Sequence, residues 1–184
     1  MTYSITRHTS DEAIAMEGEL TELYVKTYAE PPYNGGGVYT EDGFHTRNQR
    51  QFRSPGFSLI TARSSEGDLV GFAFGFTMGP GRWWGGATEP DGPVMGQDKF
   101  ALIELVVDAA HRGQGLGRRM HDEILANRPE RYSTLCAHPG AQPARDAYDR
   151  WGWVKAGTVG LADDQADVMV LDLKKDGRQP VEIA

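Results

Sequence analysis

The stretch from Val106 to Arg119 combines residue types that can bind an anion through the backbone. An apolar run ends at Asp108, a polar turn covers 111–115, and a segment with helical spacing follows. Glycines at positions 113, 115 and 117 allow a tight bend and leave backbone N–H groups open to a ligand. The first amides of a helix have no intrahelical partner and lie at the positive end of its dipole. The pattern therefore predicts a strand, a glycine-rich turn and a helix that bind a phosphate.

Two common phosphate-binding motifs do not fit this turn. The dinucleotide fingerprint needs a third glycine three residues after the second, and that position holds Arg118. A Walker loop needs a glycine followed by lysine and a hydroxyl residue, and no such sequence follows here. A glycine-rich turn can also join a strand to a helix without any ligand, so the surrounding elements must decide.

The composition describes a globular chain that is long enough for one domain with a sizeable core. We expect a single domain over residues 1–175 and a loose polar tail over 176–184. Cys136 is the only cysteine, no apolar run approaches the ~18 residues of a membrane span, and the start does not resemble a signal peptide. These features predict a cytoplasmic protein without a disulfide or a membrane partner. The net charge of −7 argues against nucleic acid and is compatible with a small cationic substrate.

Hydrophobic periodicity predicts the elements in the first half of the chain. Thr9 and Glu12 fit a capping box, and an apolar stripe with helical spacing follows as far as Tyr28. Two prolines and three glycines over 30–37 then require an irregular loop. The expected elements are a strand over 3–8, helices over 10–28 and 41–52, and an antiparallel strand pair over 57–63 and 69–78.

The second half begins with a loop over 79–97 that is rich in glycine and proline. This loop carries the adjacent Trp83 and Trp84, which can either pin a surface loop or form the wall of a ligand pocket. A nearly continuous apolar strand over 99–107 follows, and Glu104 is the charge within it. The later elements are a helix over 115–127, a strand over 132–137, a helix over 141–151 that Gly152 ends, and strands over 153–156 and 167–173.

Two segments resemble signatures of the GCN5-related N-acetyltransferase (GNAT) superfamily, and they follow one another in the order found in that family. The turn, Arg112-Gly-Gln-Gly115-Leu-Gly117, is similar to the acetyl-CoA motif Arg/Gln-x-x-Gly-x-Gly/Ala. The segment over 144–153 is similar to Asn-x-x-Ala-x-x-x-Tyr…Gly-Phe. The resemblance implies an α/β (α+β) GNAT acyl-CoA N-acyltransferase fold, with a mixed central sheet of about seven strands and about four helices. Ala141 departs from the pattern, because the family often has an asparagine there that contacts the pantetheine arm.

The resemblance implies acetyl-CoA as the cofactor and assigns the turn to its pyrophosphate. Backbone amides would bind the phosphates, and three arginines would add positive charge. The backbone at the end of the preceding strand would pair with the pantetheine arm, where an N–H can polarise the thioester oxygen. The alternative is a solvated basic start of a helix. The residues implied are Val106, Val107, Arg112, Gly113, Gln114, Gly115, Leu116, Gly117, Arg118 and Arg119.

The resemblance also assigns Tyr148 as the general acid that protonates the coenzyme thiolate. A phenol with a pKa of about 10 is matched to a thiol with a pKa of about 8.5. The alternative is a core tyrosine on an amphipathic helix. Glu104 is the candidate general base or amine ligand, because burial in an apolar strand would raise the pKa of its carboxyl. It can instead pair with a neighbouring cation.

Three other reactive side chains lie near these segments. His138, just past a strand end, is a second candidate base, and its alternative is a loop imidazole. His111 within the turn is expected to face solvent. Cys136 can suggest an acyl-enzyme nucleophile, but its place in an apolar strand favours a buried structural thiol. No metal is implied.

Acidic and aromatic residues dominate the three loops from which the family builds its acceptor pocket, here 30–39, 83–91 and 163–167. Such surfaces suit a polycationic amine, although acidic loops can also be simply solvated. The predicted acceptor-binding residues are Tyr33, Trp83, Trp84, Glu104, Asp163 and Asp164.

Together these observations predict an acetyl-CoA-dependent N-acetyltransferase that acts by direct transfer in a ternary complex on a small cationic amine. Family members that acetylate aminoglycoside or aminocyclitol antibiotics look like this chain. Such an antibiotic is therefore the leading substrate, and antibiotic resistance is the expected role. The alternatives are a peptide or protein amine as acceptor, and a non-catalytic acyl-CoA-binding module. A homodimer is compatible with the resemblance, because dimers are common among relatives.

Overall fold

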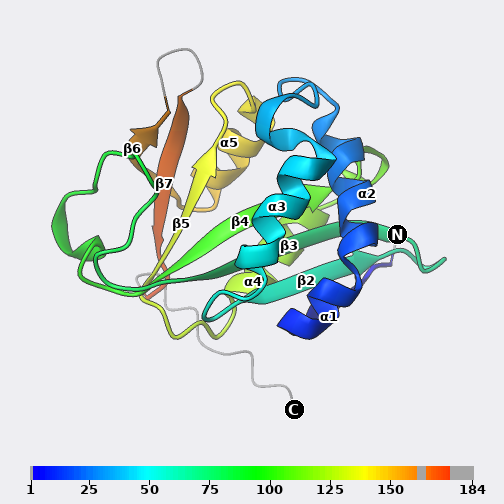
Figure 1. Ribbon diagram of the computed structural model, residues 1–184, viewed down its shortest axis with the longest axis horizontal. Coiled ribbons are helices and arrows are strands. Elements are labelled where there is room, and N and C mark those ends of the chain that lie inside the picture. Colours follow the sequence, from blue (N-terminus) through cyan, green and yellow to red (C-terminus); the bar gives the residue numbers. More distant parts are fainter. Residues whose placement is uncertain (1, 161–164, 175–184) are drawn as a thin grey trace. The chain divides into compact units, whose positions relative to one another are not determined.

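Seven strands form one mixed β-sheet in the computed structural model, which describes residues 2–160 and 165–174 (Figure 1). The strands are β1 (Ser4–His8), β2 (Ser58–Arg63), β3 (Leu69–Met78), β4 (Lys99–Val107), β5 (Tyr132–Ala137), β6 (Val154–Val159) and β7 (Ala166–Asp172). Their order in the sheet is β1-β2-β3-β4-β5-β7-β6. β4 and β5 are parallel, whereas the β1–β2, β2–β3, β5–β7 and β6–β7 pairs are antiparallel. The predicted mixed sheet is confirmed.

In the described residues, five α-helices connect these strands, rather than the four that the periodicity predicts. The helix predicted over 10–28 is interrupted at Met16, whose ψ of 11° departs from helical geometry. The other elements match their predicted ranges to within a few residues. The helices are α1 (Ser10–Ala15), α2 (Glu17–Tyr28), α3 (Glu41–Gln51), α4 (Leu116–Leu125) and α5 (Gln142–Arg150), with short 3₁₀ helices η1 (Gly37–Tyr39), η2 (Gly92–Val94) and η3 (Ala109–His111).

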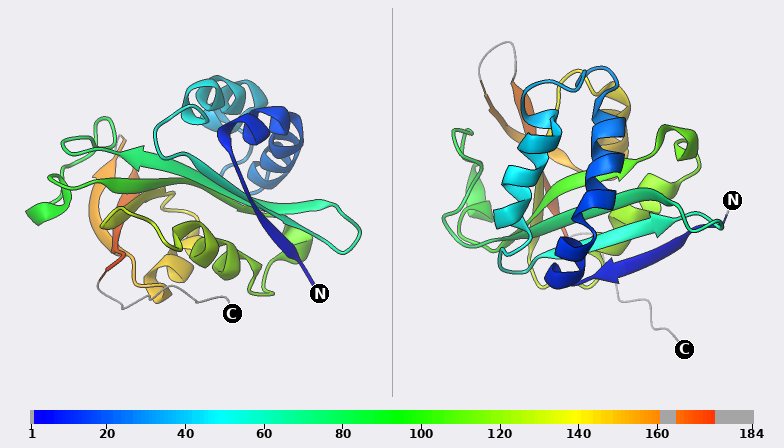
Figure 2. Two further views of the ribbon diagram at one scale, coloured as in Figure 1. Left: turned by 90° about the horizontal axis from the view of Figure 1, so that it is seen from below. Right: turned by 45° about the vertical axis from the view of Figure 1, so that its right-hand side comes forward.

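The chain divides into two compact units. The first contains the residues up to Phe76 together with Leu102–Ile124, and the second contains Thr77–Ala101 together with the residues from Leu125 onward. Within the first unit, α1, α2 and α3 lie on one face of the β1–β3 strands and α4 lies on the other, as the left view of Figure 2 shows. The predicted phosphate turn and Glu104 belong to the first unit, whereas Tyr148 belongs to the second.

Side-chain caps explain where the first helices begin. The Glu12 amide donates to the Thr9 hydroxyl at 3.3 Å, and the Thr9 amide donates to the Glu12 carboxylate at 2.7 Å, which is the predicted capping box. Thr40 caps α3 by accepting a hydrogen bond from the Gly43 amide at 3.1 Å. A Cβ at Gly43 would lie 2.8 Å from the Val38 carbonyl oxygen, so only glycine allows α3 to start this close to the preceding loop.

Aromatic rings fill the core between these helices and the sheet. Phe44 and Phe52 are buried on the predicted face of α3, and each buried ring contributes roughly 2 kcal/mol. The Phe44 ring lies 6.3 Å from Phe72 and 6.4 Å from Phe74, measured between centroids. β3 does not alternate simply between buried and exposed residues, because the whole run from Val70 to Gly75 is buried. Helices cover this part of the strand on both faces (Figure 2).

The inner face of α4 includes Leu116, Met120 and Ile124, as predicted, and all three are buried. Gly71 of β3 allows α4 to pack closely against the sheet. A Cβ at this position would lie 2.9 Å from the Met120 Cε atom and 3.0 Å from the Val106 carbonyl oxygen. This contact places the helix that starts at the phosphate turn directly on the strands of the first unit.

In the second unit a buried lysine holds the long loop over 79–97. Lys99 is fully buried, and its Nζ donates to the carbonyl oxygen of Gln97 at 2.7 Å and of Gly79 and Val94 at 3.3 Å. Burial lowers the pKa of the Lys99 ammonium. Gly152, with a φ of 89°, follows α5 in the left-handed conformation that the sequence predicts. None of the helices in the described residues is both long and apolar enough to cross a membrane.

Candidate active site

The predicted phosphate turn joins the end of β4 to the start of α4. Gly113 and Gly115 have positive φ angles of 72° and 76°, and nothing lies within 4 Å of where a Cβ would stand at either position. Residues 112–115 are exposed. Because α4 begins at Leu116, its first amides have no partner within the helix. The turn thus offers an open backbone at a helix N-terminus, which fits a phosphate group.

Two ion pairs connect this turn to the end of α2. The Asp108 carboxylate lies 2.5 Å from Lys26 Nζ, which holds the pKa of the carboxyl below its usual range. Arg112 donates from Nη1 to the Glu30 carboxylate at 2.6 Å and from Nε to the Val107 carbonyl oxygen at 3.0 Å. In this state the Arg112 guanidinium therefore pairs with a carboxylate of its own chain.

Tyr3 of the N-terminal segment contacts two residues of the turn, His111 and Gln114. Its hydroxyl donates to Gln114 Oε1 at 2.9 Å and lies 3.0 Å from His111 Nδ1. His111 is consequently half-buried against the Tyr3 ring, and the prediction that it faces solvent is wrong. Sequence alone could not show this contact, because Tyr3 lies 108 positions from His111.

The other residues predicted to bind the cofactor differ in which of their groups a ligand could contact. Val106 and Leu116 are each 1% exposed, so they can bind a ligand only through their backbone groups. Arg118 donates from Nε to Asp122 at 2.6 Å, and Arg119 Nη2 lies 3.5 Å from the Tyr3 carbonyl oxygen. A Cβ at Gly117 would lie 3.8 Å from the Val107 Cγ2 atom, which is an ordinary van der Waals distance. All of these groups lie around the turn.

Glu104 is buried on β4, with 8% of its surface exposed. Its Oε2 accepts a hydrogen bond from the Tyr28 hydroxyl at 2.7 Å, and its Oε1 lies 4.0 Å from Arg47 Nη2. Burial raises the pKa of the Glu104 carboxyl to about 7, while the Tyr28 hydrogen bond and the Arg47 charge act in the opposite direction. A carboxyl with this pKa can take up and release a proton near neutral pH.

Three tyrosine rings cover the neighbourhood of Glu104. Tyr28 stacks on Tyr39 with centroids 4.9 Å apart, and Tyr33 lies edge-on to Tyr28 at 4.6 Å and to Tyr39 at 4.8 Å. Burial and, to a smaller extent, the negative charge of Glu104 raise the pKa of Tyr28 and Tyr33. Of this aromatic cluster, sequence analysis identified only Tyr33 as a binding residue. Tyr28 has the same spacing as the core residues of its helix, so no local signal marks it as a partner of Glu104.

In the second unit, Tyr148 lies half-buried on α5. Its ring meets Trp151 and Trp153 edge-on, with centroids 5.7 and 5.9 Å away. His138 accepts a hydrogen bond at Nδ1 from the Gly140 amide at 3.0 Å, which stabilises the turn before α5. Cys136 lies in β5 as expected, but the prediction of a buried thiol is wrong because its side chain is exposed. Tyr132 and Thr134, which share a strand face with Cys136, are buried, so the exposure is local to the end of β5.

The predicted acceptor residues Trp83 and Trp84 form hydrogen bonds within the second unit. Trp83 donates from Nε1 to the Thr88 carbonyl oxygen, and Trp84 donates to Thr134 Oγ1, both at 2.9 Å. These hydrogen bonds support the interpretation of a pinned loop. The buried Asp167, from the last predicted acidic loop, pairs with Arg145 and Lys155, so cations of this chain already neutralise it. Asp163 and Asp164 lie outside the described residues.

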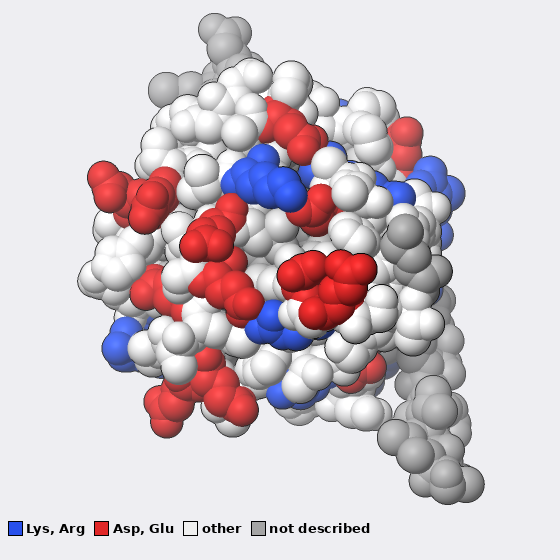
Figure 3. Space-filling view, turned by 90° about the vertical axis from the view of Figure 1, so that its right-hand side faces the viewer, with Lys and Arg blue, Asp and Glu red and all other residues white. Residues whose placement is uncertain are grey.

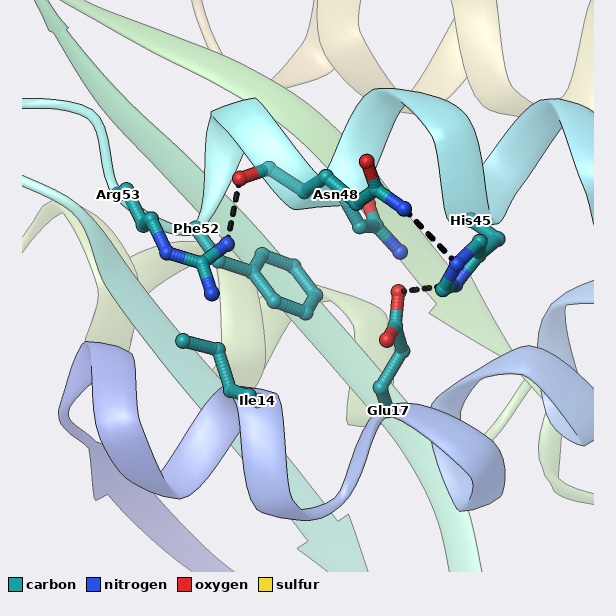
Figure 4. Close-up of a pocket in the computed structure, with 7 residues that line it drawn as sticks. Ile14, Glu17, His45, Asn48, Phe52 and Arg53 are labelled. Atoms are coloured by element: carbon teal, nitrogen blue, oxygen red, sulfur yellow. Dashed lines mark hydrogen bonds and ion pairs between the residues drawn. The ribbon is translucent and has the colours of Figure 1, made fainter.

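A separate hollow of about 410 Å³ lies between α1, α2 and α3 (Figure 4). Its wall includes the hydrogen-bonded Glu17–His45 pair, and Arg53 lies at the opposite end in this view. Asn48 points its amide toward the hollow, yet both of its polar atoms are unpaired and closed off from solvent by their neighbours. A ligand could not reach that amide without a rearrangement. None of the predicted site residues lines this hollow.

Known proteins match this architecture. The model of the Acetyltransferase (GNAT) family matches residues 19–153. A search of curated proteins finds no match. A Corynebacterium glutamicum structure described as histone acetyltransferase HPA2 and related acetyltransferase is 20% identical, with a TM-score of 0.66 over 92% of this chain and 96% of that chain. A Thermoplasma acidophilum paia N-acetyltransferase in complex with coenzyme A is 12% identical, with a TM-score of 0.60 over 94% and 99%. Aminoglycoside 6'-acetyltransferase type Ii is 17% identical, with a TM-score of 0.60 over 92% and 97%.

The seven-stranded mixed sheet, with an open glycine turn between β4 and α4, is the fold of acyl-CoA N-acyltransferases. The chain belongs to the GNAT family and is an acetyltransferase, because the family model covers most of its length. Acetyltransferases of this fold use acetyl-CoA or CoA as co-substrate, and one of the similar structures holds coenzyme A.

Proposed function

We propose that this enzyme transfers the acetyl group of acetyl-CoA directly to a small cationic amine, with an aminoglycoside or aminocyclitol antibiotic as the leading acceptor. The observation that carries the proposal is the buried Glu104 carboxyl with a pKa of about 7, which lies next to the tyrosines of the aromatic cluster. Such a carboxyl can attract an ammonium group and also accept its proton.

The open turn supports the binding of acetyl-CoA, which supplies an activated acetyl thioester. Amides of Gly113–Arg118 would hold the pyrophosphate, and Arg112, Arg118 and Arg119 would add charge. The backbone of Val106 and Val107 would pair with the pantetheine arm, and Ala141 would make no side-chain contact of the kind an asparagine makes. Leu116 would contribute only its amide, because its side chain is buried.

Catalysis in this proposal needs one base and one acid. Glu104 takes the proton from the acceptor ammonium, directly or through water, and so makes the amine nucleophilic. Tyr148 supplies a proton to the departing thiolate, and its edge contacts with Trp151 and Trp153 support a fixed ring position. No covalent enzyme intermediate is required, and the exposed Cys136 has no part in the reaction.

Charge and aromatic surface support a cationic acceptor. The chain has a net charge of −7, and on the face drawn in Figure 3 acidic side chains cover more of the surface than basic ones. Tyr33 and Tyr39, which pack on Tyr28, add aromatic surface near Glu104. Aminoglycoside 6'-acetyltransferase type Ii has a similar fold, which is compatible with an antibiotic acceptor. A peptide or protein amine is the second candidate, because one similar structure is described as a histone acetyltransferase.

Thiol release from acetyl-CoA, measured across a panel of aminoglycosides, aminocyclitols and lysine peptides, tests the proposal. We expect turnover with the small polycations, and about 10²-fold or greater loss of kcat in Tyr148→Phe. Turnover with peptides alone would select the second candidate. If acetyl-CoA binds and none of these amines is acetylated, the proposed acceptor class is wrong.

A further inference from the structure

One guanidinium on α3 contacts both the loop over 33–39 and the buried Glu104. Arg47 donates from Nη1 to the Val38 carbonyl oxygen at 2.6 Å and from Nη2 to the Tyr24 hydroxyl at 2.9 Å. The same Nη2 lies 4.0 Å from Glu104 Oε1. The Arg47 side chain is 29% exposed, so solvent screens its charge only in part.

Backbone hydrogen bonds anchor the loop at both sides of Val38: the Gly35 amide donates to the Tyr28 carbonyl oxygen at 2.8 Å and the Tyr39 amide to the Gly36 carbonyl oxygen at 3.1 Å. The loop contains three consecutive glycines, and Gly35 and Gly37 have positive φ angles of 63° and 59°. The Val38 side chain is 59% exposed and therefore does not tie the loop to the core. The hydrogen bond from Arg47 adds a side-chain anchor to the backbone at Val38, which lies between Tyr33 and Tyr39 in the sequence. Loss of the guanidinium should consequently loosen both rings.

The two oxygens of Glu104 have different neighbours. Oε2 accepts a hydrogen bond from the neutral Tyr28 hydroxyl, and Oε1 faces the Arg47 charge. The other titratable groups that interact with Glu104 are Tyr24 of α2 and Tyr33 of the loop, and both have a raised pKa. Arg47 is therefore the cation, within the described part of the chain, that favours the ionised form of Glu104.

We propose that Arg47 is a positioning residue with two roles: its fork holds the 33–39 loop, and its charge favours the ionised form of Glu104. This inference rests on the proposed function, in which Glu104 is the base and the loop contributes to the acceptor site. The planar fork of arginine binds Val38 and Tyr24 at the same time as its charge faces the carboxylate. Lysine can supply the charge but not the fork, so the two roles can be separated by substitution.

Three variants separate charge from geometry. Arg47→Met removes both the charge and the fork while keeping the length of the stem, and Arg47→Lys keeps the charge alone. Arg50→Met is the matched control, because Arg50 is an exposed arginine on the same helix. Circular dichroism establishes that each variant folds, and Arg47→Gln replaces Arg47→Met if that variant does not.

Two measurements that do not depend on enzymatic activity test the two roles of Arg47, its charge effect on Glu104 and its anchoring of the 33–39 loop. In Arg47→Met, the carboxyl titration of Glu104 followed by carbon NMR should move up by about one pH unit, as expected for the loss of a cation about 4 Å away in a solvent-screened site. Hydrogen exchange of backbone amides over 33–39 should accelerate by about tenfold. In Arg47→Lys the loop should loosen similarly, while the Glu104 titration stays within about half a unit of the wild type.

Steady-state kinetics then show whether the Glu104 titration and the order of the loop affect the reaction. In Arg47→Met the acidic limb of the kcat/KM profile should move with the Glu104 titration, and the KM for the acceptor should rise while that for acetyl-CoA stays constant. If Arg47→Met resembles Arg50→Met in both NMR and hydrogen exchange, the inference about Arg47 is wrong. If the wild type acetylates no amine, the proposed function is wrong, and NMR and exchange still decide the role of Arg47.

Discussion

At the scale of single residues, Glu104 is the side chain on which the proposed chemistry rests. The apolar strand around it predicts a carboxyl with a raised pKa, and its burial agrees with that expectation. Two partners that come from distant parts of the chain moderate the effect: Tyr28 donates to one carboxylate oxygen and Arg47 faces the other. Without these partners, burial would favour the protonated form of the carboxyl more strongly.

Replacing Glu104 with glutamine should change how stability depends on pH. The folded-state pKa of about 7 is above the ordinary value of 4.5, so the carboxyl contributes its full stability below pH 4.5 and loses it as the pH rises through 7. The loss is on the order of 3 kcal/mol. Urea unfolding between about pH 5 and about pH 9 should therefore show a steeper decline for the wild type than for Glu104→Gln. Parallel curves for the two proteins would contradict the raised pKa.

The turn between β4 and α4 shows how elements cooperate to build a binding site. Its backbone conformation follows from its own glycines, but α2 and Tyr3 hold it in place through Lys26, Glu30 and the Tyr3 hydroxyl. The Arg112–Glu30 pair has a particular consequence, since a bound phosphate would compete with Glu30 for the same guanidinium. We therefore expect Glu30 to oppose cofactor binding slightly.

Glu30→Gln should tighten acetyl-CoA binding by up to about fivefold, because an exposed ion pair is worth about 1 kcal/mol at most. Titration calorimetry with acetyl-CoA measures this change. Glu22→Gln, an exposed carboxylate of α2, is the control for a simple reduction of negative charge and should have a smaller effect. Weaker binding in Glu30→Gln would show that Glu30 orients Arg112 for the phosphate rather than competing with it.

At the scale of the whole molecule, charge is the property that bears on the acceptor. A net charge of −7 creates a field that attracts cations over distances set by the ionic strength. In the proposed function, local arginines around the turn would still allow an anionic cofactor to bind, because charge near a site outweighs the more distant net charge in salt. The two substrates of the proposed reaction should therefore respond differently to salt.

We expect kcat/KM for a polycationic aminoglycoside to fall by about tenfold between about 0.02 M and about 0.3 M sodium chloride. An amine with a single charge should lose considerably less, and it serves as the internal control at the same saturating acetyl-CoA concentration. Initial rates over a salt series measure both. Equal salt dependence for the two amines would rule out long-range attraction as a source of acceptor preference.

Local signals were sufficient for the elements and the family. Helix caps, apolar spacing and glycines act over a few residues, so the strands, the capping box at Thr9 and the phosphate turn could be predicted from the sequence. Two predictions failed on the exposure of single side chains: Tyr3 covers part of His111, and Cys136 is exposed although its neighbours in β5 are buried. A third failed on a helix boundary, because the first helix breaks at Met16 without a local sequence signal.

By itself, the sequence determined an acetyltransferase fold with an open glycine turn and one carboxyl in an apolar strand. Only the tertiary structure decided which groups surround that carboxyl, because Tyr28 lies 76 positions before Glu104 and Arg47 comes from a different helix. Contacts over such separations depend on how helices pack on the sheet, and no periodicity records them. The pKa of Glu104, and with it the proposed chemistry, is a property of that packing.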